Sequence, residues 1–355
     1  MLAWGAVSLD APPPNADNLR SWVGDGLHAG LRFMEENLDK RANPRALFPW
    51  AKTAVLFAIR QPMPFGTDTG NFRVAAYALG NDYHRVALRL FDDIKERLRE
   101  DFTVHDAHDE RNGDVAPESA RTTQLAPAQA WSASSLRFSG FCDAWPVFER
   151  DLAAEAGLGW RGKNATLLSR EHGSGFLLAG FFLDVDLRES DEARAAFPAP
   201  SRDFCGSCTA CLDACPTDAF VAPGRLDANK CISYWTIEHK GDIPEELSAK
   251  FGDRIFGCDA CQDVCPWNKK AAKTSTPAAT LPDDFPRVPE EWLTLLRKNG
   301  GLRTRFRKTP LYRAGRKSLI RNVLIAMRNA GTPLSKEWRE ILETEENDAA
   351  VRALL

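Results

Sequence analysis

The sequence predicts an α+β protein in three parts: a mixed α/β region over residues 1–190, a cysteine-rich region over residues 191–275 and a small basic helical region over residues 276–355. Helix-like and strand-like patterns alternate up to residue 190, eight of the nine cysteines lie between residues 205 and 265, and the last part shows short amphipathic helical patterns. A chain of 355 residues with 44% hydrophobic residues is long enough to build more than one core.

The first region begins with a helical pattern over residues 16–41 and continues, after the turn "ANP", with the strand "TAVLFAI". A second helix is expected from Tyr83 to Arg99, because apolar residues recur four apart along one face. Residues 101–135 are polar and rich in proline, alanine and serine, which predicts an excursion or loop.

The stretch "FCDAWPVFERDLAAEAGLGWRGKN" predicts a helix that begins near Pro146 and ends at Gly157, since proline suits the first turn and glycine the C-terminal cap. Two strands, "ATLLS" and "GFLLAGFFLDVDL", follow. The longest apolar run, "FLLAGFFL", is too short to span a bilayer, and the first residues lack the basic flank and apolar core of an export signal. We therefore expect a cytoplasmic protein with no membrane partner.

Charge is distributed unevenly along the chain. The formal net charge is -3, yet residues 297–355 hold 14 lysines and arginines against 6 acidic residues. The segment from Arg297 to Arg321 contains ten basic residues and no acidic one. Such a density commonly neutralises the phosphates of a nucleic acid, although a solvated basic face has the same composition. The sequence thus predicts a basic surface near the C-terminal end.

The clustered cysteines are expected to bind metal, because disulfides belong mainly to exported proteins. The run "CGSCTACLDACP" has the spacing C-x2-C-x2-C-x3-C-P. This spacing is typical of bacterial two-cluster ferredoxins, in which three thiolates hold one [4Fe-4S] cluster and the fourth binds the other. Zinc sites usually separate two pairs of ligands by a longer loop, so zinc is the weaker alternative.

The second run, "CDACQDVCP", repeats only the last three cysteines and carries Ile255 where a leading cysteine would stand. Cys231 is the only other cysteine in the region, and a cubane needs four thiolates. We therefore predict one cluster held by Cys205, Cys208, Cys211 and Cys265, and a second held by Cys215, Cys231, Cys258 and Cys261. Two such clusters transfer single electrons, so another part of the protein must bind the substrate and catalyse its reaction.

The glycine-rich stretch "GLGWRG" at residues 157–162 matches the dinucleotide-binding fingerprint, but it follows a helix and precedes a strand, the reverse of what that site requires. The glycines would instead allow the backbone to approach another large ligand closely. Lys163 and Asn164 would then be polar contacts of that ligand; the alternative is that they form a solvated turn. "DYHRVA" approaches the loop that supplies a histidine to cobalt in some cobalamin proteins. Ala87 replaces the required glycine, so we expect His84 at a helix start.

Five stretches, in this order, resemble epoxyqueuosine reductases: "CDAWPVFER", "AGLGWRGKN", "CGSCTACLDACPTDAF", "CISYWTIE" and "GCDACQDVCPWN". The resemblance runs from about residue 30 to about residue 330. It implies a cobalamin-dependent iron–sulfur oxidoreductase that reduces epoxyqueuosine to queuosine at the wobble position of tRNA. It further implies base-off cobalamin, two [4Fe-4S] clusters and a HEAT-like C-terminal element that favours tRNA as partner. We also expect an external electron donor and a monomeric chain.

The same resemblance implies that Asp143 of "CDAWP" donates the proton and contacts cobalamin. Phe141, Trp145 and Phe148 flank this residue and are expected to desolvate its carboxyl, which favours the protonated form of an acid. From the residues alone, an aspartate that organises the turn before Pro146 is the alternative. The other implied cobalamin contacts are Arg41, Gly162, Leu167, Leu178, Ser233, Asp259 and Ala260.

The chain departs from the family pattern at Ala76 and Asn81, where arginines are usual, and in the length of residues 101–135. Cys142 is expected to be a buried apolar residue. Two other functions are alternatives to the main one. A reductive dehalogenase-like corrinoid enzyme would share the cofactors but bring an export signal, and a non-catalytic ferredoxin-type electron-transfer module would bind clusters and no corrinoid.

Overall fold

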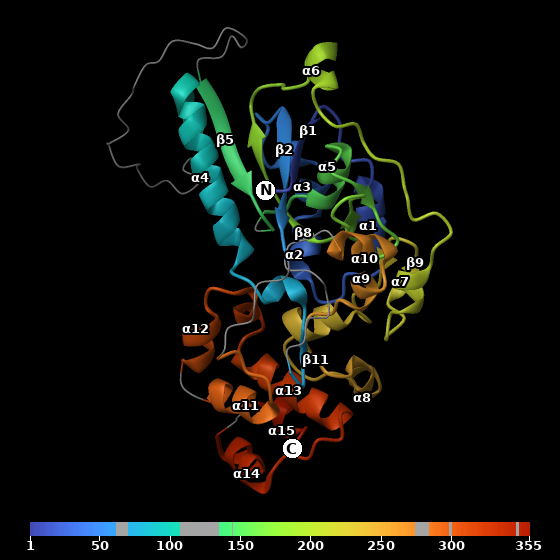
Figure 1. Cartoon of the computed structure of the whole chain (residues 1–355), viewed down its shortest axis with the longest axis vertical. Helices are drawn as coiled ribbons and strands as arrows, with labels where there is room; N and C mark the ends of the chain where they lie inside the picture. Colours follow the sequence, from blue (N-terminus) through green and yellow to red (C-terminus); the bar gives the residue numbers. More distant parts are fainter. Residues whose placement is uncertain (62–69, 107–134, 144, 274–283, 298–299, 346–347) are drawn as a thin grey trace.

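The computed structural model describes residues 1–61, 70–106, 135–143, 145–273, 284–297, 300–345 and 348–355 (Figure 1). Most of the excursion predicted over residues 101–135 lies outside these ranges. Figure 1 shows a sheet-containing part, a helical part at the opposite end, and the cysteine region against both. Within the described ranges, no helix has the length and apolar character needed to cross a membrane.

Five strands form the central sheet in the order β1 (Ala3–Ser8), β2 (Thr53–Arg60), β8 (Phe176–Leu183), β5 (Ser135–Phe141) and β4 (Thr103–Asp106). Neighbouring strands are antiparallel except for the parallel pair β4 and β5. Of the three predicted strands, "TAVLFAI" and "GFLLAGFFLDVDL" are confirmed as β2 and β8, which lie inside the sheet. The third, "ATLLS", is confirmed only at Leu167–Leu168, which lies in a separate two-stranded sheet. Strands β1, β4 and β5 were not predicted.

Helices cover both faces of this sheet (Figure 1). Helix α4 (Tyr83–Asp101) confirms the helix predicted over residues 83–99, and α5 (Glu149–Glu155) packs on the other face. Successive residues of β2 point to opposite faces. Val55 and Phe57 therefore pack in the core beneath α4, whereas Ala54 and Leu56 pack in the core beneath α5.

The helix predicted over residues 16–41 is wrong as a single element. The structure breaks it into α1 (Ala16–Gly24), α2 (Arg32–Glu35) and α3 (Leu38–Ala42), followed by the short 3-10 helix η1 (Pro44–Ala46). Gly26 and Ala29 adopt left-handed backbone conformations with φ of 70° and 53°. An α-helix cannot continue through such residues, so α1 ends before them.

Helix α5 begins at Glu149 and not near Pro146, because the Val147 N–H bonds to the Trp145 carbonyl in a tight turn (2.7 Å). Its predicted end is confirmed, since Gly157 follows it with a φ of 80°. The hairpin of β6 (Trp160–Arg161) and β7 (Leu167–Leu168) comes next. "GLGWRG" thus follows a helix, contains β6 and leads into β7, so it precedes no helix and does not have the context of a dinucleotide site.

The cysteine region consists of short elements. Ile255, which stands where the second motif lacks a cysteine, is 0% exposed and belongs to the core. That position therefore serves packing. The elements in chain order are α6 (Asp191–Ala195), α7 (Ala210–Asp213), β9 (Phe220–Ala222), β10 (Arg225–Leu226), the π-helical turn η4 (Tyr234–Glu238), α8 (Glu245–Ser248), η5 (Ala249–Phe251), β11 (Arg254–Phe256), α9 (Ala260–Asp263) and α10 (Pro266–Ala272).

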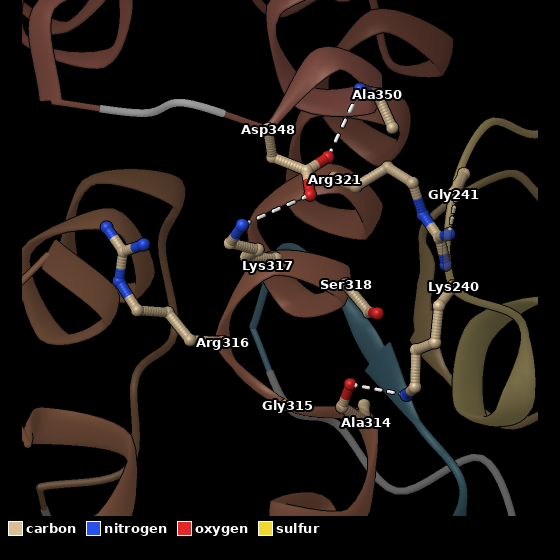
Figure 2. A pocket seen from close by; sticks show the side chains of 10 residues that line it. All are labelled: Lys240, Gly241, Ala314, Gly315, Arg316, Lys317, Ser318, Arg321, Asp348 and Ala350. Atoms are coloured by element: carbon tan, nitrogen blue, oxygen red, sulfur yellow. Dashed lines mark hydrogen bonds and ion pairs between the residues drawn. The ribbon is translucent and has the colours of Figure 1, made fainter.

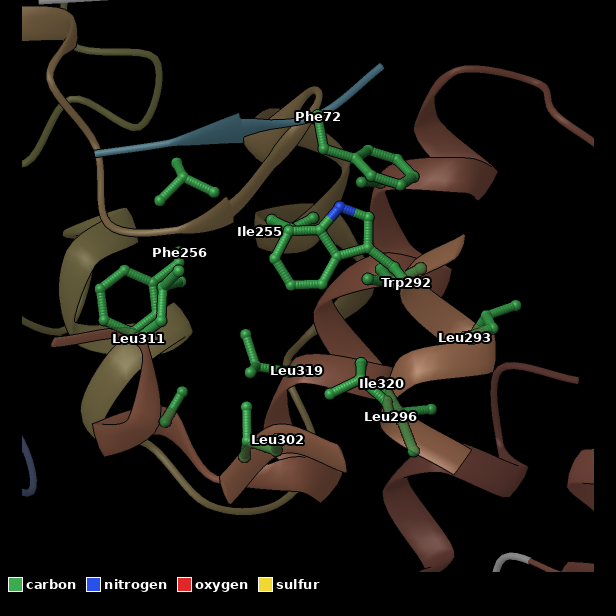
Figure 3. Close-up of a cluster of buried hydrophobic side chains, with 14 of the residues drawn as sticks. Phe72, Ile255, Phe256, Trp292, Leu293, Leu296, Leu302, Leu311, Leu319 and Ile320 are labelled. Atoms are coloured by element: carbon green, nitrogen blue, oxygen red, sulfur yellow. The ribbon is translucent and has the colours of Figure 1, made fainter. Parts of the chain in front are cut away.

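The short C-terminal helices are confirmed as α11 (Pro289–Arg297), α12 (Gly301–Phe306), η6 (Pro310–Ala314), α13 (Arg316–Asn329), α14 (Lys336–Glu345) and α15 (Ala349–Arg352). They pack around Trp292 (Figure 3). Strand β3 (Arg73–Val74) pairs in parallel with β11, and the 3-10 turn η2 (Ala76–Ala78) follows β3. The same core therefore includes β11 and residues from the first part of the chain. Helix α13 is not amphipathic as expected, since every residue from Ser318 to Met327 is buried.

Candidate active site

The first set of cysteines surrounds Cys211, which lies in α7. Burial raises the pKa of the Cys211 thiol, and three other thiols raise it further: Cys265, Cys205 and Cys208. Closely spaced thiols oppose one another's ionisation, because each thiolate repels the next. A bound cationic metal group removes that penalty and holds all four as thiolates. These four are the residues named for the first cluster, and their proximity supports that assignment.

The second set centres on Cys231, which precedes η4. Burial raises its pKa, and Cys215 contributes in the same direction. The Cys258 thiol has its pKa raised to about 11, by burial first and with a further contribution from Cys231. Burial also raises the pKa of Cys261, followed by the effects of Cys258 and Cys231. The thiols named for the second cluster therefore influence one another as the first four do.

Backbone and side-chain N–H groups point at these sulfurs, as is usual around iron–sulfur clusters. The Ala219 N–H donates to the Cys215 Sγ (3.3 Å), and Trp160 Nε1–H donates to the Cys205 Sγ (3.4 Å). All nine cysteines are free of disulfides. Within the described ranges, no three His, Cys, Asp or Glu side chains close around a single ion. A cubane does not need that, because each of its four thiolates binds a different iron.

The other chemical feature is the turn that follows β5, where Asp143 stands. This residue has a left-handed backbone with a φ of 53°, a conformation that is uncommon outside glycine, although aspartate tolerates it better than most residues. Two contacts hold it. Tyr83 Oη donates to Asp143 Oδ2 (2.8 Å), and the Asp143 N–H donates to Glu149 Oε1 (2.6 Å). The first residues of α4 and α5 therefore fix the turn from two sides.

The expectation that aromatic neighbours desolvate Asp143 is wrong for the protein alone. Asp143 is exposed, whereas Phe141, two residues before it, is buried in the core. Burial acts on its neighbour. The pKa of Glu149 rises from 4.5 to about 8, chiefly because the carboxyl is desolvated and secondly because of the charge of Asp143.

Two arginines, Arg41 and Arg313, complete the surroundings of Asp143. Burial lowers the pKa of Arg41, while the charges of Asp143 and Glu149 raise it, so Arg41 lies within their reach. Arg313 donates to Glu238 Oε1 from its Nε (2.6 Å), a bond that raises the pKa of Arg313. The charge of Asp143 acts on Arg313 in the same direction. A half-open site thus gathers side chains from five separate stretches of the chain.

Tyr77 connects this site to the second set of cysteines. Burial raises its pKa, and the charges of Asp143 and Asp259 raise it further, so Tyr77 lies within range of both carboxylates. Asp259 stands between Cys258 and Cys261 in the sequence. Its Oδ2 accepts the Ala76 N–H (2.7 Å), and it is only 9% exposed. Asp143 and the cysteine region therefore both lie within electrostatic range of the same side chain, that of Tyr77.

The residues implied as cobalamin contacts fall into two neighbourhoods. Arg41 lies beside Asp143, and Leu178 lies beside Cys142, whose Sγ donates to the Leu178 carbonyl (3.4 Å). Leu167 belongs to the same core as Leu178. In the second neighbourhood, Ser233 hydrogen-bonds to the Cys231 sulfur and Ala260 to that of Cys258, next to Asp259.

Two buried polar atoms suit a further polar ligand. Arg41 Nε and Asn164 Nδ2 are buried and have no hydrogen-bond partner among the described residues. Such groups are costly unless something satisfies them. Gly162, two residues before Asn164, has no room for a side chain, since a Cβ would meet Leu168 and the Asn164 amide. Lys163 does not serve as a polar contact there, because its Nζ donates to the carbonyls of Gly206 (2.6 Å) and Cys208 (3.0 Å).

The structure also tests the predictions for two single residues, His84 and Cys142. His84 is confirmed at a helix start, with its N–H capped by Asp82 (3.0 Å). Cys142 is confirmed as buried. Of the two departures from the family pattern, Ala76 is buried against Asp259 and Asn81 is exposed.

Sequence reasoning missed Tyr77, Tyr83 and Glu149 as members of the site. Only the position of Glu149, six residues after Asp143 within "CDAWPVFER", offered a signal.

Comparisons with known proteins identify relatives of this chain. Family models described as "4Fe-4S double cluster binding domain" and "Epoxyqueuosine reductase QueG, DUF1730" match residues 204–268 and 41–109. An epoxyqueuosine reductase of Xanthomonas campestris pv. campestris is 34% identical over 93% of this chain and 83% of its own. That of Alicycliphilus denitrificans is 34% identical over 97% and 88%. A crystal structure of epoxyqueuosine reductase with a tRNA-Tyr epoxyqueuosine-modified tRNA stem loop has a TM-score of 0.77 and 26% identity, covering 99% of this chain and 84% of that one.

Proposed function

Because the chain belongs to the epoxyqueuosine reductase family, we propose that it reduces epoxyqueuosine in the anticodon loop of a tRNA to queuosine. Its relatives are named reductases, and the chain is accordingly an oxidoreductase. One observation carries the proposal for this chain: an exposed carboxyl in a left-handed turn lies one tyrosine away from a double-cluster domain. Acid and electron supply are thus combined in one place.

The chain carries a [4Fe-4S] double-cluster domain. We assign Cys205, Cys208, Cys211 and Cys265 to one cluster and Cys215, Cys231, Cys258 and Cys261 to the other, because the larger effects of one thiol on another fall within these two sets; the smaller effect of Cys211 on Cys261 indicates that the two sets are neighbours. The second cluster lies nearer the acid, since Asp259 between two of its ligands borders Tyr77. Electrons from an external donor enter at the first cluster.

Cobalamin, bound base-off, is the proposed reducing cofactor, and the residues present are compatible with it. Arg41 Nε and Asn164 Nδ2 are buried donors that need an acceptor, and the amide groups around a corrin ring are such acceptors. Bound cobalamin supplies a strongly reducing cobalt centre. We assign its contacts to Arg41, Asp143, Gly162, Leu167 and Leu178 on one side and to Ser233, Asp259 and Ala260 on the other.

Asp143 is the proposed proton donor. Converting an epoxide to an alkene releases its oxygen as water and consumes two electrons and two protons. Tyr83 occupies Asp143 Oδ2, and no described residue hydrogen-bonds to Oδ1. That oxygen is therefore left to protonate the substrate oxygen as the carbon–oxygen bond breaks, while solvent supplies the second proton. The left-handed turn holds the carboxyl in place, because Glu149 restrains its N–H.

The remaining assignments are coarser. Residues 1–190 form the proposed cobalamin-binding catalytic region, residues 191–275 the ferredoxin-like region and residues 276–355 the HEAT-like element that contacts tRNA. We further propose that the protein acts in the cytoplasm as a monomer.

The decisive experiment incubates the anaerobically reconstituted protein, with cobalamin and a reductant, on tRNA isolated from cells that lack this activity. Mass analysis of the nucleosides should show queuosine. Asp143→Asn keeps the size of the side chain and should abolish conversion while the cluster absorbance stays intact. Asp191→Asn, at an exposed site, is the matched control and should convert normally. Unchanged epoxyqueuosine with both cofactors loaded would refute the function, and full turnover by Asp143→Asn would remove the assigned donor.

A further inference from the structure

Three aromatic side chains form a patch beside the first set of cysteines. Trp160, Phe204 and Trp267 pack together with their ring centroids 5.1, 5.2 and 6.0 Å apart. They belong to the same cluster of apolar contacts as Cys205 and Cys265. Trp160 is buried, whereas Phe204 and Trp267 are partly exposed. This aromatic patch therefore extends from the ligands proposed for the first cluster to the surface of the protein.

Cationic side chains from three separate segments stand over the aromatic patch. The guanidinium of Arg202 lies 4.9 Å from the centre of the Phe204 ring, and that of Arg170 lies 5.1 Å from the same ring. Lys270 Nζ lies 5.5 Å from the centre of the Trp267 ring. All three cations are exposed. Cation–π contacts at exposed sites are weak, so they orient these side chains without neutralising their charge.

The lysines of α10 extend this positive charge. Lys269 and Lys270 are exposed on α10, and Lys273 directly follows the helix. Residues 266–273 contain no acidic residue. No carboxylate among the described residues forms an ion pair with these lysines or with the two arginines. We call these five side chains the cationic face.

Carboxylates near the cationic face are fewer, and two of the three already accept hydrogen bonds. Glu171 and Asp203 adjoin the two arginines in the sequence, and Asp213 lies on α7. Asp203 Oδ1 accepts the Cys205 N–H (2.7 Å), and Asp213 Oδ2 accepts the Thr209 hydroxyl proton (2.8 Å). The surface around the first cluster therefore keeps an excess of positive charge.

Cations around the pocket beside α13 differ from these, because they already have partners (Figure 2). There, Lys240 Nζ donates to the Ala314 carbonyl (2.7 Å), and Lys317 Nζ pairs with Asp348 (3.5 Å). At the cationic face, no described residue accepts a hydrogen bond from the charged groups of the side chains that stand over the aromatic patch. Those groups are available to a partner molecule.

The cationic face adjoins the most accessible of the proposed cluster ligands. Residues 206–209 are exposed and include Cys208, which is the only exposed one of the eight cysteines assigned to the clusters. The four cysteines assigned to the second cluster are all partly buried. An electron from outside the protein therefore reaches the first cluster more directly than the second.

We propose that the cationic face and the aromatic patch bind a small acidic protein that carries one electron at a time on a flavin or an iron–sulfur centre. The inference rests on the proposed function and names the class of its external donor. Complementary charge brings such a carrier to the face, and aromatic rings and arginines are favoured at protein interfaces. Electron-transfer complexes need only a small contact area.

The electron count fixes how often this contact is used. Reducing one epoxide to an alkene consumes two electrons, so two reduced carriers bind in turn. Each carrier is oxidised by one electron, which the first cluster accepts and passes to the second. The oxidised carrier must then leave before the next one binds, which a weak, charge-dependent contact allows.

A double variant tests the assignment. Arg202→Gln with Lys270→Gln removes two charges from the cationic face, and both side chains are exposed, so the fold is expected to persist. The matched control, Arg194→Gln with Lys336→Gln, removes the same two charges from exposed sites on α6 and α14. Figure 1 shows these helices at opposite ends of the molecule. Iron content and unfolding temperature show whether each variant is folded and loaded.

The first measurement is binding. The probes are an acidic flavodoxin and an acidic [2Fe-2S] ferredoxin, each labelled with fluorescein and titrated with the cluster-loaded protein. At about 50 mM KCl the double variant should bind about fivefold more weakly than the wild type, because two surface ion pairs are lost. At about 500 mM KCl the two proteins should converge, since salt screens the charges. The control variant should match the wild type within about twofold at both salt concentrations.

The second measurement is the rate at which each carrier, in its reduced form, reduces the clusters in a stopped-flow spectrometer. The double variant should be about fivefold slower at low salt, because its cations no longer steer the carrier. Reduced methyl viologen, a small cation that needs no docking face, should reduce both proteins at similar rates. A lowered cluster potential would slow both reductants, whereas a lost docking contact slows only the protein carriers.

Three results would overturn the proposal. The first is that neither carrier binds or reduces the wild type better than the double variant. The second is an equal loss in the control variant, which would show that overall charge and not this face attracts the carrier. The third is weaker binding of an anticodon stem-loop RNA by the double variant while both carriers are unaffected, which would assign the face to RNA.

Conversion of epoxyqueuosine, with methyl viologen as the reductant, is measured in parallel and separates this inference from the proposed function. Conversion by the wild type, together with equal carrier binding by wild type and double variant, would refute only the docking face. Weaker carrier binding by the double variant, without any conversion by the wild type, would refute only the reaction.

Discussion

Replacing Glu149 by glutamine tests the restraint on the catalytic turn. Burial raises the pKa of Glu149 from 4.5 to about 8, and the charge of Asp143 adds to this. A carboxyl whose pKa is raised in the folded state binds its proton more tightly there than in the unfolded chain. The wild type therefore loses stability as the pH rises from about 4.5 through about 8. The glutamine side chain cannot ionise, yet its amide oxygen can still accept the Asp143 N–H that Glu149 Oε1 accepts.

The size of the effect follows from that pKa. The full difference corresponds to an upper bound of about 5 kcal/mol. Because the Glu149 side chain is only partly buried, solvent screens the interaction, and we expect about 3 kcal/mol in total. About a third of this falls between pH 6 and pH 8. Relative to the wild type, Glu149→Gln should thus gain about 1 kcal/mol of unfolding free energy over that range.

Urea unfolding of the cluster-loaded protein at pH 6, 7 and 8 measures this difference. Glu155→Gln removes a carboxylate from the same helix and is the matched control, which should run parallel to the wild type. A constant difference between Glu149→Gln and the wild type across the three pH values would show that Glu149 is ionised throughout. The account of a desolvated carboxyl beside Asp143 would then be wrong.

Three further predictions concern the clusters and the packing. Cys215→Ser should lose about half of the bound iron, because it removes one of four ligands of a cluster, whereas Cys142→Ala should lose none; iron analysis and electron paramagnetic resonance measure this. Lys163→Met should lower the midpoint potential of the first cluster, because the Lys163 ammonium bonds to the loop that carries two of its ligands and stabilises the added electron. A potentiometric titration measures this, and Lys163→Arg should keep most of the wild-type potential. Gly5→Ala should destabilise the protein by about 2 kcal/mol or more, because the new methyl would collide with the Ala156 carbonyl; an unchanged denaturation midpoint would contradict this.

The double-cluster region was the most predictable part of the chain. Cluster ligation imposes a local spacing, and Cys205 to Cys215 satisfy it within one short run. The central strands β2 and β8 were equally accessible, because a strand buried on both faces is a continuous apolar run. The edge strands β1 and β4 carry no such run, and their pairing depends on partners distant in the sequence.

The surroundings of Asp143 could not be predicted in the same way. The aromatic residues around it in the sequence suggested a desolvated acid, yet the left-handed turn leaves its carboxyl exposed, and Glu149 is desolvated in its place. Backbone conformation decided which carboxyl is buried, and aspartate, although it tolerates a positive φ better than most residues, does not by itself predict one. Likewise, Arg321 was counted with the basic surface. It is 2% exposed and donates to the carbonyls of Trp235 (2.8 Å) and Gly241 (2.5 Å), so it also stabilises the fold.

The position of the site depends on a contact that none of the motifs encodes. Residues 73–74 leave the sheet region and pair in parallel with β11, directly before the second cysteine run. This pairing brings Ala76 onto Asp259 and places the next residue, Tyr77, within electrostatic range of both Asp259 and Asp143. Tyr83, a few residues later, then reaches Asp143 from the start of α4. One short crossing segment therefore sets the distance between acid and cluster, and a change there would alter electron supply and proton supply together without touching a ligand.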